Sequence, residues 1–184
     1  MAGGIGGGPM SAAVGFPVPR IAGIDGGVGT SLVATMLEVP FDSGTRAPGE
    51  QVDVLVCRSV TGQVARAIAT TMAMPVPPVL VVVDDCGQIW PKTARQRVEM
   101  ARPNLPAVVR VPWIEQLRSV DDPHLLLAEA LHGHDYLDEV PRWALPAQKA
   151  AQELVTAVTG LLTERHETRL PAPESNNDNQ EEHR

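Results

Sequence analysis

The chain has 184 residues, of which 43% are hydrophobic, so it is long enough to form one compact domain with a sizeable core. Its net charge of −7 disfavours a general nucleic-acid-binding protein, because such proteins usually carry a basic surface. No segment approaches the roughly 18 consecutive apolar residues that a membrane-spanning helix needs. We therefore expect a protein that neither crosses a membrane nor binds nucleic acid.

The ends of the chain differ in composition from its middle. Residues 1–17 are rich in glycine and alanine and carry no charge, which predicts a flexible arm rather than a signal peptide. Residues 166–184 predict a disordered acidic tail, which leaves 18–165 as the folded domain. The two cysteines, Cys57 and Cys86, have no metal-binding spacing, and this usage is typical of free thiols in a reducing cytoplasm.

A glycine-rich turn between a strand and a helix is the main functional signal. Residues 20–37 read RIAGIDGGVGTSLVATML. The pattern predicts an apolar strand at 21–24, a turn with three glycines, and a helix that starts at Thr30. Because glycine has no Cβ and adopts positive φ easily, the N–H groups of such a turn can converge on an anion. This order of elements predicts a phosphate-binding loop.

The segment DGGVGTS, from Asp25 to Ser31, resembles the deviant Walker A loop of the ParA/MinD-type P-loop ATPases. That loop reads lysine, two glycines, any residue, glycine, lysine, and then serine or threonine. The matching positions are Gly26, Gly27, Gly29 and Ser31. Asp25 stands where the family has its signature lysine, and Thr30 stands where it has the phosphate-binding lysine. The resemblance therefore implies that the loop keeps its shape and has lost its charge chemistry.

The resemblance also implies a set of ligand-binding residues, with ATP or ADP and Mg²⁺ as the ligands. The phosphates would lie against Gly26, Gly27, Val28, Gly29, Thr30 and Ser31. Ser31 would also be a ligand of the metal ion. Asp84 stands at the place near the nucleotide base where the family commonly has asparagine, and Ile114 stands where it commonly has aspartate. The chain therefore departs from the family pattern at both of these positions.

Apolar strands alternate with helical patterns along the rest of the chain. Further strands are predicted at 52–59, 77–85 and 107–113. Helices are predicted at 30–39, 61–72, 93–101, 123–132 and 145–162. The connection 40–51 is polar and lacks the strand, switch region and Walker B aspartate that ParA/MinD-like proteins place there. The alternation predicts an α/β fold in three layers, with a mainly parallel sheet and helices on both faces, as in P-loop NTPases.

Several other polar residues are candidates for chemistry. Asp84 and Asp85 follow the third strand, at the edge where open α/β sheets bind ligands, and only one of two adjacent residues can face a crevice. Both a catalytic or magnesium-linked carboxylate and a solvated loop fit this place, and the second is favoured. Asp53, at the start of its strand, is expected to be structural.

Two further groups have a functional and a structural interpretation. The HGHD segment at 132–135 could supply two imidazoles and a carboxylate to a metal ion, but a loop with exposed histidines is favoured. The two cysteines lie near strand ends without a histidine at activating spacing, so buried thiols are expected.

Three functions remain open. The first, which we favour, is a degenerate ParA/MinD-like protein in regulation or positioning, with weak or lost nucleotide binding and little ATP hydrolysis; the resemblance implies a protein partner and a homodimer. The second is an active nucleotide hydrolase in which an arginine, with Arg58 as the candidate, replaces the missing lysine. The third is an interaction scaffold with a relic loop. The first is favoured because only the loop backbone and Ser31 can be assigned to hydrolysis.

Overall fold

The computed structural model describes residues 18–40, 42–133 and 140–169. Within these residues the strands form one parallel sheet in the order β1-β2-β3-β4. Their bounds are β1 (Ile21–Gly23), β2 (Val54–Arg58), β3 (Val79–Val83) and β4 (Val108–Val111). Since all strands are parallel, their carboxyl ends share one edge of the sheet, where ligands bind in open α/β folds.

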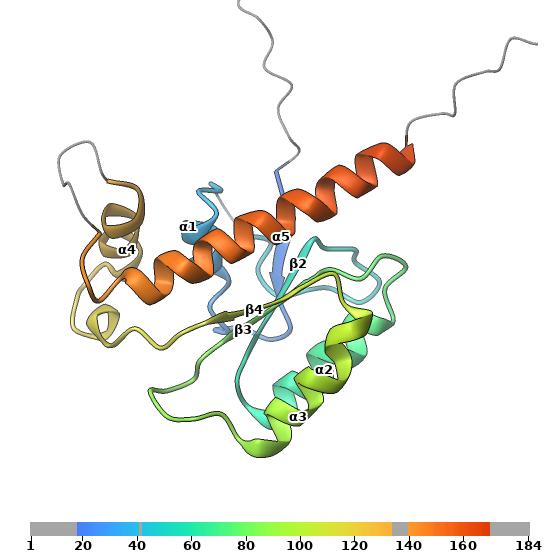
Figure 1. Cartoon of the computed structure of the whole chain (residues 1–184), viewed down its shortest axis with the longest axis horizontal. Helices are drawn as coiled ribbons and strands as arrows, with labels where there is room; N and C mark the ends of the chain where they lie inside the picture. Colours follow the sequence, from blue (N-terminus) through green and yellow to red (C-terminus); the bar gives the residue numbers. More distant parts are fainter. Residues whose placement is uncertain (1–17, 41, 134–139, 170–184) are drawn as a thin grey trace, which may run out of the picture.

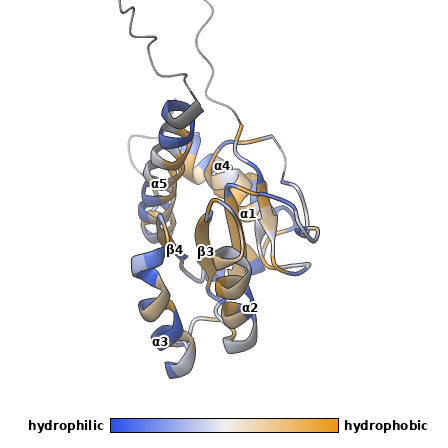
Figure 2. Cartoon of the chain, turned by 90° about the vertical axis from the view of Figure 1, so that its right-hand side faces the viewer, coloured by the Kyte–Doolittle hydropathy of each residue, from blue (hydrophilic) through white to orange (hydrophobic). Residues whose placement is uncertain are grey.

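The helices cover both faces of this sheet (Figures 1 and 2). Their bounds are α1 (Thr30–Met36), α2 (Thr61–Met72), α3 (Lys92–Ala101), α4 (Pro123–His132) and α5 (Leu145–Arg169). Two 3₁₀ helices, η1 (Arg102–Asn104) and η2 (Glu115–Arg118), flank β4 in sequence. Helices α1, α4 and α5 pack on one face and α2 and α3 on the other. The predicted α/β fold with a parallel sheet between helices is confirmed.

Alternate strand residues enter two separate hydrophobic cores, because successive side chains of a strand point to opposite faces. The core beneath α1, α4 and α5 contains the strand residues Ile21, Val54, Val56, Val79, Val81, Val109 and Val111. The core beneath α2 and α3 contains the strand residues Ala22, Leu55, Cys57, Leu80 and Val82. Burial on both faces explains why the middle strands read as continuous apolar runs.

Helix α2 has the predicted bounds, but its buried face is rotated from the predicted one. The sequence pattern predicts Val64, Ala65, Ile68 and Met72 toward the sheet. In the structure Val64, Ala67 and Thr71 are buried, and Met72 is 48% exposed. The reason is that α2 packs against α3 as well as against the sheet, so both contacts together determine which face of the helix is buried.

The folded domain is expected to span residues 18–165. Helix α5 continues to Arg169, four residues beyond the expected end of the domain at 165. The expected arm at 1–17 and the rest of the expected tail, from 170, lie outside the described residues. None of the helices within the described ranges is long and apolar enough to cross a membrane.

The segment that follows α1 covers the free edge of β1. The N–H of Gly23 donates to the carbonyl of Gly44 at 2.7 Å, and the N–H of Arg46 donates to the carbonyl of Gly23 at 2.8 Å. One isolated parallel bridge joins Gly23 and Thr45. An open sheet edge presents unpaired backbone groups to other chains, and this segment removes that exposure.

Candidate functional site

The predicted loop lies between β1 and α1, at the carboxyl edge of the sheet. Gly27 and Gly29 have φ angles of 70° and 97°, a region that residues with a Cβ rarely adopt. Gly23, at the end of β1, is constrained differently. A Cβ at Gly23 would lie 2.6 Å from Cγ2 of Val28 and 2.7 Å from the carbonyl oxygen of Asp25. The loop therefore depends on Gly23 as well, a residue that the motif does not include.

The backbone of this loop presents a row of unpaired hydrogen-bond donors. No N–H group from Gly26 to Leu32 donates a hydrogen bond of ordinary geometry to another described residue. A Cβ at Gly26 or Gly27 would meet nothing within 4 Å, so the space beside the loop is open. Exposed N–H groups at such a turn are the donors that an anion requires.

A cavity of about 210 Å³ lies beside the loop at the carboxyl edge of the sheet. Its lining includes Gly27, Val28, Gly29, Arg58, Asp84 and Trp113. Sites for drug-sized ligands usually measure about 300–1,000 Å³, so this cavity suits a phosphate-sized group better than a whole nucleotide.

Two arginines lie at the loop, and both have partners. Arg58, at the end of β2, donates from Nε and Nη2 to the carbonyl oxygen of Gly27, at 3.0 and 2.7 Å. Its Nη1 donates to Asp85 at 2.8 Å. Arg66 of α2 forms an ion pair with Asp25. The structure thus places the sequence-predicted Arg58 at the loop, and a second arginine, Arg66, compensates the charge of the Asp25 carboxylate.

Ser31, the expected metal ligand, has an acidic neighbour that sequence reasoning missed. Its Oγ donates to Oδ2 of Asp42 at 2.8 Å, and Oδ1 of Asp42 accepts from the N–H of Gly44 at 2.8 Å. A hydroxyl and a carboxylate are hard oxygen ligands of the kind that Mg²⁺ prefers. Asp42 lies in the connection 40–51, where no pattern singled it out.

Asp84 belongs to a polar cluster at the carboxyl end of β3. Its side chain is only 4% exposed and accepts from Nε and Nη2 of Arg110, at 2.9 and 2.6 Å. The indole N–H of Trp90 also donates to it, at 2.5 Å. The guanidinium of Arg110 lies 5.3 Å from the Trp90 ring centroid, within the range of a cation–π interaction. The carboxylate of Asp84 thus has Arg110 and Trp90 as its hydrogen-bond partners.

The hydrogen bond to Asp84 also stabilises the charged form of Arg110. It raises the pKa of the Arg110 guanidinium above its ordinary value, against the opposing effect of partial burial. Arg110 therefore stays charged at any physiological pH.

The other candidate residues have structural partners. Asp53 is buried just before β2 and pairs with Arg165 of α5, as its expected structural role requires. His132 places Nδ1 2.7 Å from a carboxylate oxygen of Glu38 and Nε2 3.1 Å from the carbonyl oxygen of Thr35. His134 and Asp135 lie outside the described residues. In the part of the chain that is described, no three His, Cys, Asp or Glu side chains are grouped to hold a metal ion.

The two cysteines lie in different surroundings. Cys57 is buried on β2, and burial raises the pKa of its thiol from 9.0 to about 12. Cys86 is free and exposed, so the expectation of buried thiols is wrong for this residue. The reason is that Cys86 follows Asp84 and Asp85 in the loop after β3, beyond the buried part of the strand.

We expect one thiol per chain to react with iodoacetamide in the folded protein and two in denaturant, because the reactive species is an accessible thiolate. Cys86→Ser should abolish nearly all labelling of the folded protein, and Cys57→Ser should leave it unchanged. Mass spectrometry of the labelled protein measures both. Rapid modification of Cys57 in the folded state would contradict the burial of this residue.

Comparison of the chain with protein-family models, with curated proteins and with solved structures gives no significant match. The assignment of a function therefore depends on the loop and its surroundings.

Proposed function

We propose that this chain is a degenerate ParA/MinD-like P-loop protein that binds phosphate groups or nucleotides weakly and hydrolyses ATP little. Its role would be regulatory or positional, through a protein partner. The observation that carries the proposal is the row of unpaired N–H groups from Gly26 to Leu32, next to open space. These N–H groups are free to bind a ligand, and a phosphate group supplies charged acceptor oxygens for them.

The residues at the loop fit a phosphate with a magnesium ion in part. The N–H groups of the loop would hold the phosphate oxygens, and Ser31 with Asp42 would hold the metal ion. Mg²⁺ bound there would neutralise phosphate charge. The small cavity at the loop is the reason to expect weak binding of a complete nucleotide.

The charges around the loop support little hydrolysis. Phosphoryl transfer needs cations on the phosphates, a metal ion and a group that positions water. Neither lysine position of the family motif carries a cation, since Asp25 and Thr30 occupy them. Arg66 is paired with Asp25, and Arg58 with Gly27 and Asp85. These contacts direct both guanidinium groups toward the protein's own oxygens.

One observation favours the arginine-dependent hydrolase as a second candidate. Arg58 contacts the loop directly, and its side chain is 45% exposed, so it can exchange Gly27 for a phosphate without disturbing a core. Metal-dependent phosphate release that disappears in both Arg58→Ala and Ser31→Ala would identify this second function.

The melting temperature with and without Mg-ATP, Mg-ADP or inorganic phosphate tests the proposal. Ligand at a hundred times its dissociation constant stabilises a protein by about 2.7 kcal/mol, and we expect a smaller effect at millimolar ligand. Ser31→Ala should reduce the shift that depends on Mg²⁺. No shift with any of the three ligands would favour the scaffold function instead.

Thr30→Lys is expected to tighten ATP binding at least tenfold, because it restores the cation at the position of the family's phosphate-binding lysine. A charged hydrogen bond in a desolvated site is worth roughly 2–5 kcal/mol when one partner is removed, which leaves a margin for imperfect geometry. Asp25→Lys added to Thr30→Lys should tighten binding further. Calorimetric titration of ATP into the wild type, Thr30→Lys and the double mutant measures the three affinities. Undetectable binding in all three proteins, with the mutants folded, would show that the loop does not bind phosphate.

A further inference from the structure

Strand β4 leaves one side of its backbone unpaired. It pairs only with β3 among the described residues. The carbonyl oxygens of Ala107 and Val111 accept hydrogen bonds from the β3 side, at 3.1 and 2.9 Å. Because alternate residues of a parallel strand bond to the same neighbour, Val108 and Arg110 turn their N–H and C=O groups outward. No group in the described part of the chain bonds to these outward backbone groups.

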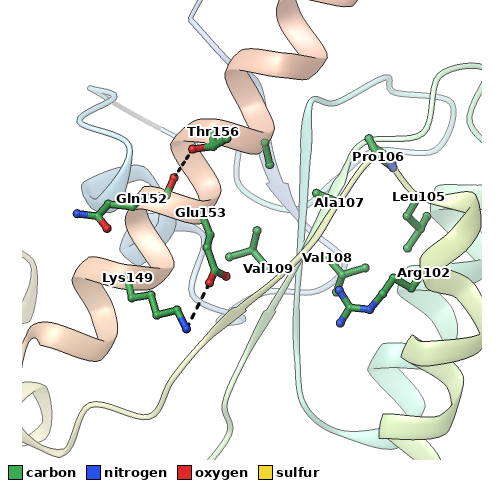
Figure 3. A pocket seen from close by; sticks show the side chains of 11 residues that line it. Arg102, Leu105, Pro106, Ala107, Val108, Val109, Lys149, Gln152, Glu153 and Thr156 are labelled. Atoms are coloured by element: carbon green, nitrogen blue, oxygen red, sulfur yellow. Dashed lines mark hydrogen bonds and ion pairs between the residues drawn. The ribbon is translucent and has the colours of Figure 1, made fainter.

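Open space flanks this edge on both sides. A groove of about 670 Å³ extends across it, from Lys149 and Glu153 on α5 to Arg102 and Leu105 beyond α3 (Figure 3). A second hollow, of about 410 Å³, lies on the α3 side and is lined partly by Ile89, which is 81% exposed. The unpaired backbone is therefore accessible to an extended segment of another chain.

The two edges of the sheet differ in whether another segment covers them. Residues 43–46 cover the edge at β1, whereas no described segment covers the edge at β4. Pro106 and Pro112 border β4 and limit the length that can pair. Proline has no N–H to donate to a ladder, so pairing at this edge is confined to residues 107–111.

We propose that a second copy of this chain pairs with β4 in antiparallel orientation about a two-fold axis at Val109. In this register Val108 of each copy lies opposite Arg110 of the other. Each such pair exchanges two hydrogen bonds, N–H to C=O in both directions, so all outward groups of Val108 and Arg110 are satisfied. The pairing is self-complementary, as a two-fold interface must be.

The charges at the edge favour this register. Arg110 would lie opposite a valine rather than opposite a second arginine, and like charges directly opposite each other destabilise a strand pair. Charges of both signs flank the edge on each side. Lys149 and Glu153 lie on α5, Glu99 lies on α3, and Arg102 begins η1. An antiparallel copy can bring each charge near its opposite.

Backbone pairing alone does not make a stable dimer, since specific interfaces bury roughly 1,200–2,000 Å² in total. The flanking helices of the two copies would have to meet over the grooves, with Ile89 as an apolar contact. None of the residues that pair belongs to the loop. The dimer is therefore independent of the proposed function, and nucleotide should not be needed to form it.

Sedimentation of the full chain at about 1–100 µM tests the dimer, since this range detects dissociation constants of the same micromolar order. We expect the mass of a dimer to increase with concentration. Val108→Pro should give a monomer throughout, because it removes an outward N–H and no bond to β3. Val108→Thr, which keeps the N–H, should remain dimeric. A wild-type monomer at about 100 µM, or a dimer only with Mg-ATP, would overturn the proposal.

A disulfide test decides the register even if Val108→Pro fails to fold. With Cys86 replaced by serine, Val109→Cys should form an intermolecular disulfide under mild oxidation. Directly opposed residues of a non-hydrogen-bonded antiparallel pair lie about 4.5 Å apart at Cα, which a disulfide can bridge. Ala107→Cys is the matched control and should not cross-link, because the register separates the two copies of residue 107 by about four residues. Equal cross-linking of both variants, or of neither, would overturn the register.

Discussion

Replacing Asp53 with asparagine is expected to lower the free energy of unfolding by about 3 kcal/mol, since removal of one member of a buried ion pair leaves an uncompensated charge. The side chain of Asp53 is 8% exposed and pairs with Arg165 of α5. Its other oxygen accepts from the N–H of Arg20 at 2.7 Å. Nε and Nη2 of Arg165 are buried without another hydrogen-bond partner in the described residues, so the charge has no alternative contact.

Urea denaturation of wild type and variant measures this effect. Glu153→Ala is the matched control on the same helix, because Glu153 pairs with Lys149 only at 3.9 Å on an exposed surface. Exposed pairs of this kind contribute between zero and about 1 kcal/mol. Arg165→Met added to Asp53→Asn should recover part of the lost stability, because it removes the unpaired charge. A loss below about 1 kcal/mol for Asp53→Asn would show that the pair does not hold α5 to the start of β2.

Gly23→Ala is expected to lower the free energy of unfolding by about 2 kcal/mol and to weaken anion binding at the loop. The added Cβ would lie 2.6 Å from Val28 and 2.7 Å from the backbone oxygen of Asp25, so the loop must move. Overpacking of this kind costs roughly 1–3 kcal/mol. The displacement would also shift the N–H groups that face the anion.

Gly26→Ala is the control for Gly23→Ala, because a Cβ at Gly26 meets nothing within 4 Å. It should change stability by less than about 0.5 kcal/mol. Urea denaturation of both variants, with phosphate titrated into each, separates the two effects. Equal stability of the two variants would contradict the close packing of the loop against the end of β1.

Much of the fold could be predicted from local patterns. Apolar runs at 77–85 and 52–59 predicted the two middle strands, although the structure shortens them to Val79–Val83 and Val54–Arg58. The bounds of α2 and α4 agree with those predicted. These elements can be predicted from the sequence because a buried strand, or a helix that begins after a turn, imposes a pattern on residues that are close together in the chain. The ends of the strands are predicted less accurately, because the apolar pattern continues past the last residue that pairs with a neighbouring strand.

The candidate site was predictable only in its backbone. The glycines of the loop are a local signal, since positive φ and close approach favour residues without a Cβ. The side-chain partners are not local. Arg66 lies 41 residues from Asp25, Arg110 lies 26 residues from Asp84, and Asp42 lies 11 residues from Ser31. No periodicity connects such pairs, so sequence reasoning missed them.

The sequence by itself determined an α/β chain with a glycine turn between its first strand and first helix, because both features depend on residues close in the chain. The tertiary structure decided what surrounds that turn. Packing of β2 and α2 beside the loop brings Arg58 and Arg66 to its oxygens, and packing of β4 beside β3 directs Asp84 to Arg110. It also decided which sheet edge stays open, because covering β1 depends on where the segment after α1 lies rather than on any pattern within it.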